Sequence, residues 1–241
     1  MLDVLLFAAL PYTALFMFLV VTIVRYRRDP YTFSTLSSQF MESKRLFWGS
    51  VPFHLGLAVL FFGHLIAFAF PRHLTMWNSV PVRLFILEST ALAAALLTLF
   101  GLSVLVARRI RSARLRANTS TMDIVVYTVL LIEISTGIWV ALTLRWGSAW
   151  FTLTAAPYLW SIVTFSPEIQ RVAELPVAAQ AHIVGAWVLV ALFGFTRLVH
   201  ALVAPVPYLW RPVQMVIWNW ERRRNAAYQR GVDRKGPGHD N

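Results

Sequence analysis

The fold is decided by the run GSVPFHLGLAVLFFGHLIAFAF at residues 49–70, which contains no Asp, Glu, Lys or Arg. About 20 apolar residues are enough for a helix to cross the hydrocarbon core of a bilayer. Comparable runs precede and follow this one, so we expect an all-α polytopic membrane protein with a bundle of five transmembrane helices. Their expected bounds are residues 2–24, 49–70, 84–107, 124–144 and 177–203.

The composition agrees with a membrane protein. Hydrophobic residues make up 58% of the 241 residues, charged residues only 14%, and the mean hydropathy is +0.60. Soluble domains carry about 25% charged residues, so this composition excludes a soluble globule. The sequence contains no cysteine, which excludes disulfides, cysteine-ligated iron–sulfur clusters, thiolate zinc sites and covalently attached c-type haem. Any metal held by this chain therefore needs histidine ligands.

The net charge of +11 has an uneven distribution along the chain. Basic residues gather after the first and third expected spans and at the C-terminal end, whereas the other two loops hold few. The positive-inside rule then predicts an N-terminus outside (periplasmic) and a cytoplasmic C-terminus. We expect the charge to report this topology or to dock a soluble partner, and we expect no nucleic-acid partner. The cytoplasmic set comprises Arg25, Arg27, Arg28, Lys44, Arg45, Arg108, Arg109, Arg111, Arg114, Arg116 and seven residues from Arg211 onward.

Two segments follow from this pattern. Residues 1–218 form the expected membrane domain with its five spans, and residues 219–241 form a polar cytoplasmic tail rich in arginine and glycine. Such a tail is typical of a segment that becomes ordered only against a partner.

Four histidines lie inside the expected spans, where ionisable side chains usually mark a function. His182 and His200 are 18 residues apart, which on an ideal helix is five whole turns, so they share one face about 27 Å apart. His54 and His64 are about 15 Å apart on the second span. Because the second and fifth spans run in opposite directions, His54 matches the depth of His200, and His64 matches that of His182.

Two neutral imidazoles at one depth suit the axial ligation of a haem iron between helices. The pairs therefore predict two b-type haems stacked across the membrane. A hydrogen-bonded packing histidine is the alternative for any single residue. Zinc or copper is the other alternative, although we expect no acidic side chain or third histidine at either depth to complete a four-ligand site.

With these residues in view, the sequence resembles the gamma subunit of respiratory nitrate reductase, a membrane-embedded di-haem cytochrome b. The resemblance covers residues 1 to about 218, and its most specific part surrounds His200. The residues that carry it are DPYT at 29–32, SSQ at 37–39, Phe53-His54, Gly63-His64, SARLRANT at 112–119, Asp123, SIVTF at 161–165, RLVH at 197–200 and PVPYL at 205–209.

The resemblance implies ligands, partners and a location. It assigns His54 and His200 to an inner haem, and His64 and His182 to an outer haem. It implies that electrons from membrane quinol (menaquinol or ubiquinol) pass through both haems to an iron–sulfur (beta) subunit and then to a molybdenum (alpha) subunit that reduces nitrate. The location implied is the bacterial cytoplasmic (inner) membrane, where the chain is surrounded by lipid.

Two other classes of function stay open on the residues alone. One is the cytochrome b subunit of another quinone-linked complex, of the formate dehydrogenase or hydrogenase type. The other is a transporter in which the histidines form a proton relay without haem. The first differs in its soluble partners, and the second predicts a colourless protein.

The resemblance also implies a quinol site near Gly63 and His64. In the family a lysine at the outer end of the third span binds the quinone oxygen, and this sequence lacks it. Arg83 is the candidate replacement, with interfacial anchoring as its alternative role. Glu88, one or two turns deeper, is a candidate acceptor for a proton released from quinol.

Two further charged residues lie within or beside the expected spans. Glu133 is near the middle of the fourth span, where we expect a hydrogen bond to a facing helix in preference to a proton-transfer role. Arg197 is one turn before His200 and is a candidate partner for the propionates of the inner haem. Snorkelling of Arg197 to the cytoplasmic surface is compatible with that role.

Overall fold

The computed structural model describes residues 1–33, 44–144 and 147–203, and these form one compact unit. All regular elements in these ranges are helical, which confirms the all-α prediction. The predicted tail at 219–241 and the PVPYL motif at 205–209 lie outside the described residues.

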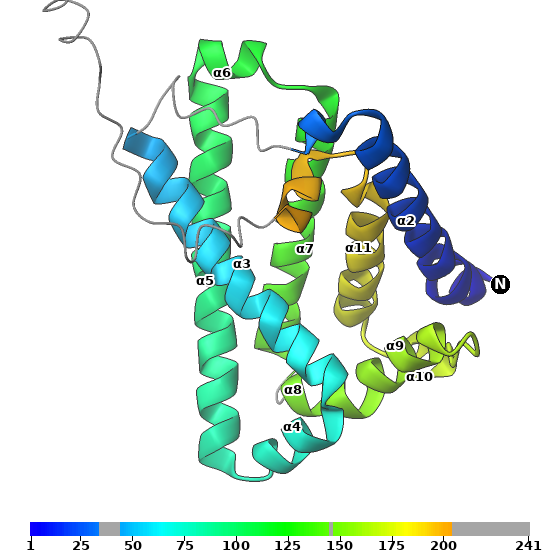
Figure 1. Ribbon diagram of the computed structural model, residues 1–241. Helices are drawn as coiled ribbons and strands as arrows, with labels where there is room; N and C mark the ends of the chain where they lie inside the picture. The colour runs from blue at the N-terminus through cyan, green and yellow to red at the C-terminus, as the bar shows by residue number, and fades with distance from the viewer. Residues whose placement is uncertain (34–43, 145–146, 204–241) are drawn as a thin grey trace, which may run out of the picture. The chain divides into compact units, whose positions relative to one another are not determined.

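Four helical segments are long and apolar enough to cross a membrane, and they correspond to the first four predicted spans. The first combines a short α-helix, a π-helical turn and a long α-helix into one segment, Leu2–Arg28. Pro11 lies at the second position of the long helix, where it removes one backbone donor and favours the preceding π turn. Their bounds are α1 Leu2–Val4, η1 Leu5–Ala9, α2 Leu10–Arg28, α3 Lys44–Ala69, α5 Pro81–Arg111 and α7 Thr121–Thr143 (Figure 1).

The fifth apolar segment differs from the prediction of one continuous helix over 177–203. An α-helix, α11, spans Val177–Phe193, and a separate 3₁₀ helix, η4, spans Arg197–Leu202. The 17 residues of α11 are at the short end of what crosses a bilayer. The prediction that His182 and His200 share a single straight helix is therefore wrong.

The break between α11 and η4 is stabilised by a residue from the other end of the sequence. Thr196 is extended, with φ −117° and ψ −178°, and its hydroxyl accepts a hydrogen bond from the backbone N–H of Leu198. The guanidinium of Arg25, on α2, donates to the carbonyl oxygens of Gly194 and Thr196 at 2.9 and 2.8 Å. In a continuous helix, backbone N–H groups would donate to these carbonyl oxygens. Here the Arg25 side chain donates to them instead.

The long helices pack side by side, and the helices that carry histidines have different neighbours. α3 packs along α5, α5 contacts α7, and α11 packs against α7 and α2. A Cβ on Gly101 of α5 would lie 2.4 Å from the backbone nitrogen of Phe53 on α3, so these two helices approach closely only because residue 101 is glycine.

The two ends of this unit differ in character (Figure 1). At one end, which we call the basic end, α2 and α5 finish in arginines such as Arg25, Arg108 and Arg109. The other, the capped end, is covered by short helices. The basic end also carries η2 Pro30–Thr32 and α6 Ala113–Ala117, and the capped end carries α4 Pro71–Asn78, α8 Gly147–Trp150, η3 Phe151–Ala155, α9 Ala156–Val163 and α10 Gln170–Ala173.

Tyr158 fixes the cap to the first span. Its side chain is fully buried, and its hydroxyl donates to the carbonyl oxygen of Phe7 at 2.9 Å. The hydroxyl of Tyr12 returns a hydrogen bond to the carbonyl oxygen of Ile162 at 3.2 Å. The cap is therefore bonded into the bundle.

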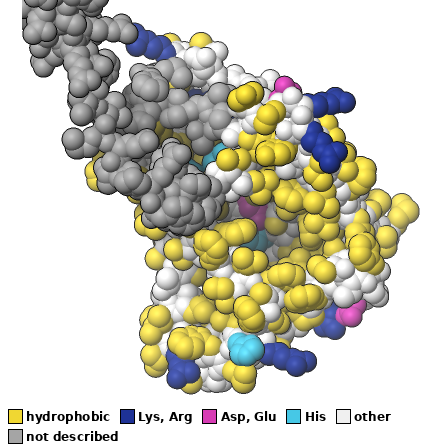
Figure 2. All heavy atoms as spheres, in the orientation of Figure 1, with side chains coloured by type: hydrophobic (Ala, Val, Ile, Leu, Met, Phe, Trp, Pro, Cys, Tyr) yellow, Lys and Arg dark blue, Asp and Glu magenta, His cyan; other side chains and the backbone are white. Residues whose placement is uncertain are grey.

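The outer surface is predominantly apolar. Figure 2 shows hydrophobic side chains over most of one face, with arginine and lysine near its two ends. Large side chains such as Phe61, Phe62, Ile66 and Leu142 are more than half exposed. A surface of this kind is suited to lipid contact.

Candidate functional site

The four histidines of the spans form two facing pairs. The ring centroids of His54 and His200 are 6.2 Å apart, and those of His64 and His182 are 6.3 Å apart. α3 supplies one member of each pair, whereas η4 and α11 supply the other two. This is the pairing that depth along antiparallel spans predicts.

The spacing within each pair leaves room for one metal ion between the rings. A metal–nitrogen bond to imidazole is about 2 Å, and the ring centroid lies about 1 Å behind the nitrogen, so rings on opposite sides of one ion have centroids about 6 Å apart. Both observed separations agree with that value. Within the residues that the structure describes, no three His, Asp or Glu side chains gather as a closed metal site. Each pair thus presents two imidazoles that could hold one metal ion between them.

Hydrogen bonds orient every one of these imidazoles. The Nδ1 atoms of His54 and His64 each lie 2.8 Å from a carbonyl oxygen one turn earlier, that of Ser50 and Leu60 respectively. His200 bonds in the same way to the carbonyl oxygen of Arg197. Because Nδ1 carries the proton that these carbonyls accept, Nε2 keeps its lone pair for a metal.

His182 has a different set of acceptors, all from α7. Its Nδ1 lies 3.0 Å from Glu133 Oε1, 3.1 Å from the Glu133 carbonyl oxygen and 3.4 Å from Thr136 Oγ1. The predicted hydrogen bond from Glu133 to a facing helix is confirmed. The prediction that no acidic side chain lies at the depth of either pair is wrong, because the position of a residue along one span does not reveal which neighbour it faces.

Figure 2 shows histidine and acidic side chains at the floor of a hollow in the apolar face. His54 and His64 are exposed along α3, and His182 and His200 are partly buried. All four rings thus keep some accessible surface.

A charged network at the basic end holds the segment that carries His200. Both carboxylate oxygens of Asp123, at the start of α7, contact Arg197, at 2.8 and 3.0 Å. Arg109 reaches the same carboxylate at 3.2 Å. Asp123 also forms a capping box with Ser120. Arg197 therefore supports His200 twice, through its carbonyl oxygen and through its anchored side chain.

The candidate quinol-site residues occupy separate places near the capped end. A Cβ on Gly63 would meet no atom within 4 Å, so this position beside His64 faces open space. The guanidinium of Arg83 lies 4.9 Å from the ring centroid of Trp77, on α4. Glu88 Oε1 accepts hydrogen bonds from the N–H and hydroxyl of Ser148, both at 3.2 Å.

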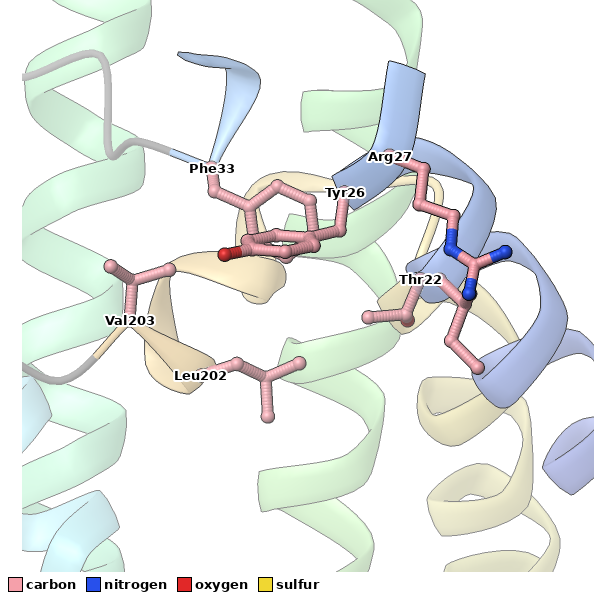
Figure 3. Close-up of a pocket in the computed structure, with 7 residues that line it drawn as sticks. Thr22, Tyr26, Arg27, Phe33, Leu202 and Val203 are labelled. Carbon is pink, nitrogen blue, oxygen red and sulfur yellow. The ribbon is translucent and has the colours of Figure 1, made fainter. Parts of the chain in front are cut away.

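An open pocket at the basic end contains no histidine. Figure 3 shows Thr22 and Tyr26 of α2 across an opening from Leu202 and Val203, with the Phe33 ring against Tyr26. Its lining is mostly apolar, with Arg27 and the hydroxyl-bearing Thr22 and Tyr26 as the exceptions. This pocket is therefore distinct from both histidine pairs.

Sequence reasoning missed the structural roles of three residues. The sequence indicates Arg25 as part of a topology signal or a docking surface, Asp123 as part of a motif, and Glu133 without its partner His182. The one signal available was chemical, since a carboxyl group inside an apolar span needs a donor. No sequence signal indicated which helix would supply it.

The fold and the site define an integral membrane protein that sets two pairs of histidines between its helices. Comparison with known proteins then identifies the family. Residues 3–219 match the nitrate reductase gamma subunit family, and the chain belongs to it.

Two gamma chains agree with this assignment over nearly their whole length. The chain is 30% identical to the nitrate reductase gamma chain of Bacillus subtilis over 86% of this chain and 94% of that protein. It is also 30% identical to the respiratory nitrate reductase 1 gamma chain of Escherichia coli, over 89% and 97%. A match of 31% to the nitrate reductase-like protein NarX of Mycobacterium tuberculosis covers 88% of this chain and 33% of the longer relative.

Proposed function

We propose that this chain is the membrane anchor and quinol-oxidising cytochrome b subunit of a respiratory nitrate reductase. Two b-type haems, when bound, supply one-electron carriers between quinol and the soluble subunits. His54 and His200 are the proposed ligands of the inner haem, and His64 and His182 those of the outer haem. The partners are an iron–sulfur (beta) subunit and a molybdenum (alpha) subunit, which carries out nitrate reduction.

One observation carries this proposal: two imidazole pairs, each spaced for one iron, with every Nδ1 bonded to a backbone carbonyl oxygen. A histidine proton relay needs no such spacing and gains nothing from fixing Nδ1 at all four positions. Membership of the nitrate reductase gamma family further favours the nitrate reductase complex over formate dehydrogenase or hydrogenase.

The proposed topology follows from the basic end. Arginines at this end favour a cytoplasmic location, which puts the capped end and the N-terminus outside. We include α11 with η4 as the fifth span of a protein of the bacterial inner membrane. The soluble subunits then dock at the basic end, near His54 and His200, and exposed arginines there are suited to an acidic partner.

The proposed quinol site lies at the capped end beside His64. Gly63 leaves open space for a flat ring, and Arg83 is the candidate to hold a quinol oxygen. Oxidation of one quinol releases two electrons and two protons, and Glu88 is the candidate for accepting a proton. Its bonds to Ser148 show that its carboxyl group already accepts from two donors.

A reduced-minus-oxidised spectrum of the purified complex, with haem quantified per chain, tests the function. We expect about two b haems, falling to about one in His54→Ala and in His64→Ala. His73→Ala is the matched control, because His73 lies on α4, outside both pairs. A folded preparation without haem contradicts the proposal, as does a loss in the His73 variant equal to that in the other two.

The quinol site has its own test. Glu88→Gln keeps the shape of the side chain but removes its capacity to take a proton, so we expect quinol oxidation to slow without loss of haem. Arg83→Leu is expected to raise KM for quinol. Unchanged quinol kinetics in both variants, at normal haem content, would remove these residues from the site.

A further inference from the structure

The two proposed haem sites differ in one hydrogen bond. Three of the four histidines bond through Nδ1 to a carbonyl oxygen of their own helical segment, at Ser50, Leu60 and Arg197. His182 alone bonds across a helix interface, and it alone lies against a carboxyl group. The side-chain group beside the Nδ1 of His54 is neutral, the Ser50 hydroxyl at 3.3 Å.

Both helices leave space for the contact between Glu133 and His182. A Cβ on Gly185 of α11 would lie 2.1 Å from Glu133 Oε2, and a Cβ on Gly137 of α7 would lie 2.9 Å from His182 Cε1. Any larger residue at either position would displace one partner. Two glycines on facing helices thus accommodate one carboxyl–imidazole contact.

The Glu133 side chain has little else to bind. It is 12% exposed, Oε1 contacts His182, and Oε2 is buried without a hydrogen-bond partner among the described residues. A buried carboxyl group costs free energy unless a donor compensates it. A group kept in such a place, and aimed at a histidine, points to a role exerted through that histidine.

We propose that Glu133 is a positioning residue for the outer haem, holding the Nδ1–H of His182 and lowering the midpoint potential of that haem relative to the inner one. The inference rests on the proposed function, because it takes His182 as an axial ligand. It adds a role for Glu133 that the histidine pairing alone does not give.

The physical basis is the effect that a hydrogen-bond acceptor at Nδ1 has on a histidine that binds a metal through Nε2. A carboxyl oxygen at Nδ1 draws the N–H proton toward itself and makes Nε2 a stronger electron donor. A stronger donor favours the oxidised iron, so the potential falls. A lower potential at the outer site than at the inner site favours electron transfer from the capped end toward the basic end.

Redox potentiometry of the purified complex tests the inference, with each haem followed by its absorbance and its low-spin electron paramagnetic resonance signal. We expect the outer midpoint potential to rise in Glu133→Gln and to rise further in Glu133→Leu, while the inner potential stays constant. The glutamine variant keeps the side-chain volume and an acceptor oxygen, which protects folding. Selective loss of the outer haem in the leucine variant, with the inner haem retained, also supports the inference.

Two control variants separate the contact from general effects. Thr136→Val removes the weaker hydroxyl neighbour of the same Nδ1, and Glu168→Gln removes an acidic group from an exposed loop position paired with Arg171. We expect little or no shift in either. An unchanged outer potential in Glu133→Leu overturns the inference, as does an equal change at both haems. Absence of haem from the unmodified protein instead contradicts the proposed function.

Discussion

Arg25 and Thr196 are 171 positions apart in sequence, yet the Arg25 guanidinium donates a 2.8 Å hydrogen bond to the carbonyl oxygen of Thr196. A second bond from the same nitrogen reaches Gly194 at 2.9 Å. The first span thereby stabilises the break after α11, four residues before His200. We therefore expect the basic-end histidine pair to depend on this contact.

We expect Arg25→Met to leave these carbonyls without their donor and to destabilise the fold by about 2 kcal/mol. Arg25→Lys keeps the charge but lacks the two further nitrogens through which the guanidinium also bonds Thr32, and we expect it to recover only part of the loss. Thermal unfolding and haem content measure both effects, and inner haem should be lost in preference to outer haem. Equal retention of both haems in Arg25→Met would contradict this dependence.

Asp123→Asn should destabilise the same end of the molecule. Asp123 is buried and pairs with Arg109 and Arg197, so an amide leaves two guanidinium groups without their counter-charge. We expect a loss of about 2–3 kcal/mol, since the two arginines keep some access to solvent. Asp3→Asn, at an exposed position near the N-terminus, is the control. A similar melting temperature for the two variants would exclude a structural role for the network.

Tyr158→Phe should loosen the cap by about 1–2 kcal/mol, because the carbonyl oxygen of Phe7 loses its buried donor. The control is Tyr31→Phe, since Tyr31 is 95% exposed. Equal unfolding free energies for the two variants would show that the hydroxyl bond contributes nothing.

Alkaline pH should lower the free energy of unfolding through the hydroxyl of Tyr158. Burial raises the pKa of Tyr158 to about 12, above the ordinary value of 10.0. The unfolded chain loses this proton first, so the stabilising contribution is complete below about pH 10 and disappears as pH rises toward 12. The free energy of unfolding should therefore fall less steeply over this range in Tyr158→Phe than in the unmodified protein. Parallel curves would contradict the assignment.

Gly101→Ala should disrupt the packing of α3 on α5. The new Cβ would lie 2.4 Å from the backbone nitrogen of Phe53 and 2.7 Å from the carbonyl oxygen of Gly49, and backbone atoms cannot rotate away as a side chain can. We expect destabilisation of more than about 2 kcal/mol. Gly63→Ala, which adds a Cβ in open space, should fold normally, although the proposed quinol site predicts weaker quinol binding. Normal stability of Gly101→Ala would show that the helices separate easily.

Much of the fold and the histidine pairing could be predicted because both depend on simple periodicities. Apolar runs of bilayer length give the first four spans, and alternating directions give the depth of each histidine. His54 faces His200, and His64 faces His182, because the members of each pair lie at the same depth on segments that run in opposite directions. The family resemblance, confirmed over residues 3–219, rests on the short motifs around the same residues.

The remaining features depend on contacts between distant parts of the chain. The break between Phe193 and Arg197 occurs within an apolar run and is stabilised by Arg25 from another span. The partner of Glu133 depends on the rotation of α7 about its axis, which hydrophobic periodicity leaves unspecified when a helix is apolar on all sides. Long-range complementarity of this kind cannot be obtained from one helix at a time.

The break after α11 also bears on how this protein tolerates insertions and deletions. In a continuous helix, one residue inserted between His182 and His200 would turn the second imidazole by about 100° away from its partner. Here η4 is held by Asp123, through Arg197, and by Arg25, through Thr196, in place of a continuous helical backbone. A change of length around Phe195 would therefore spare the anchor of Arg197 on Asp123. It would separate Gly194 from Thr196, whose carbonyl oxygens share one Arg25 nitrogen, so we expect a loss of stability while His200 keeps its orientation.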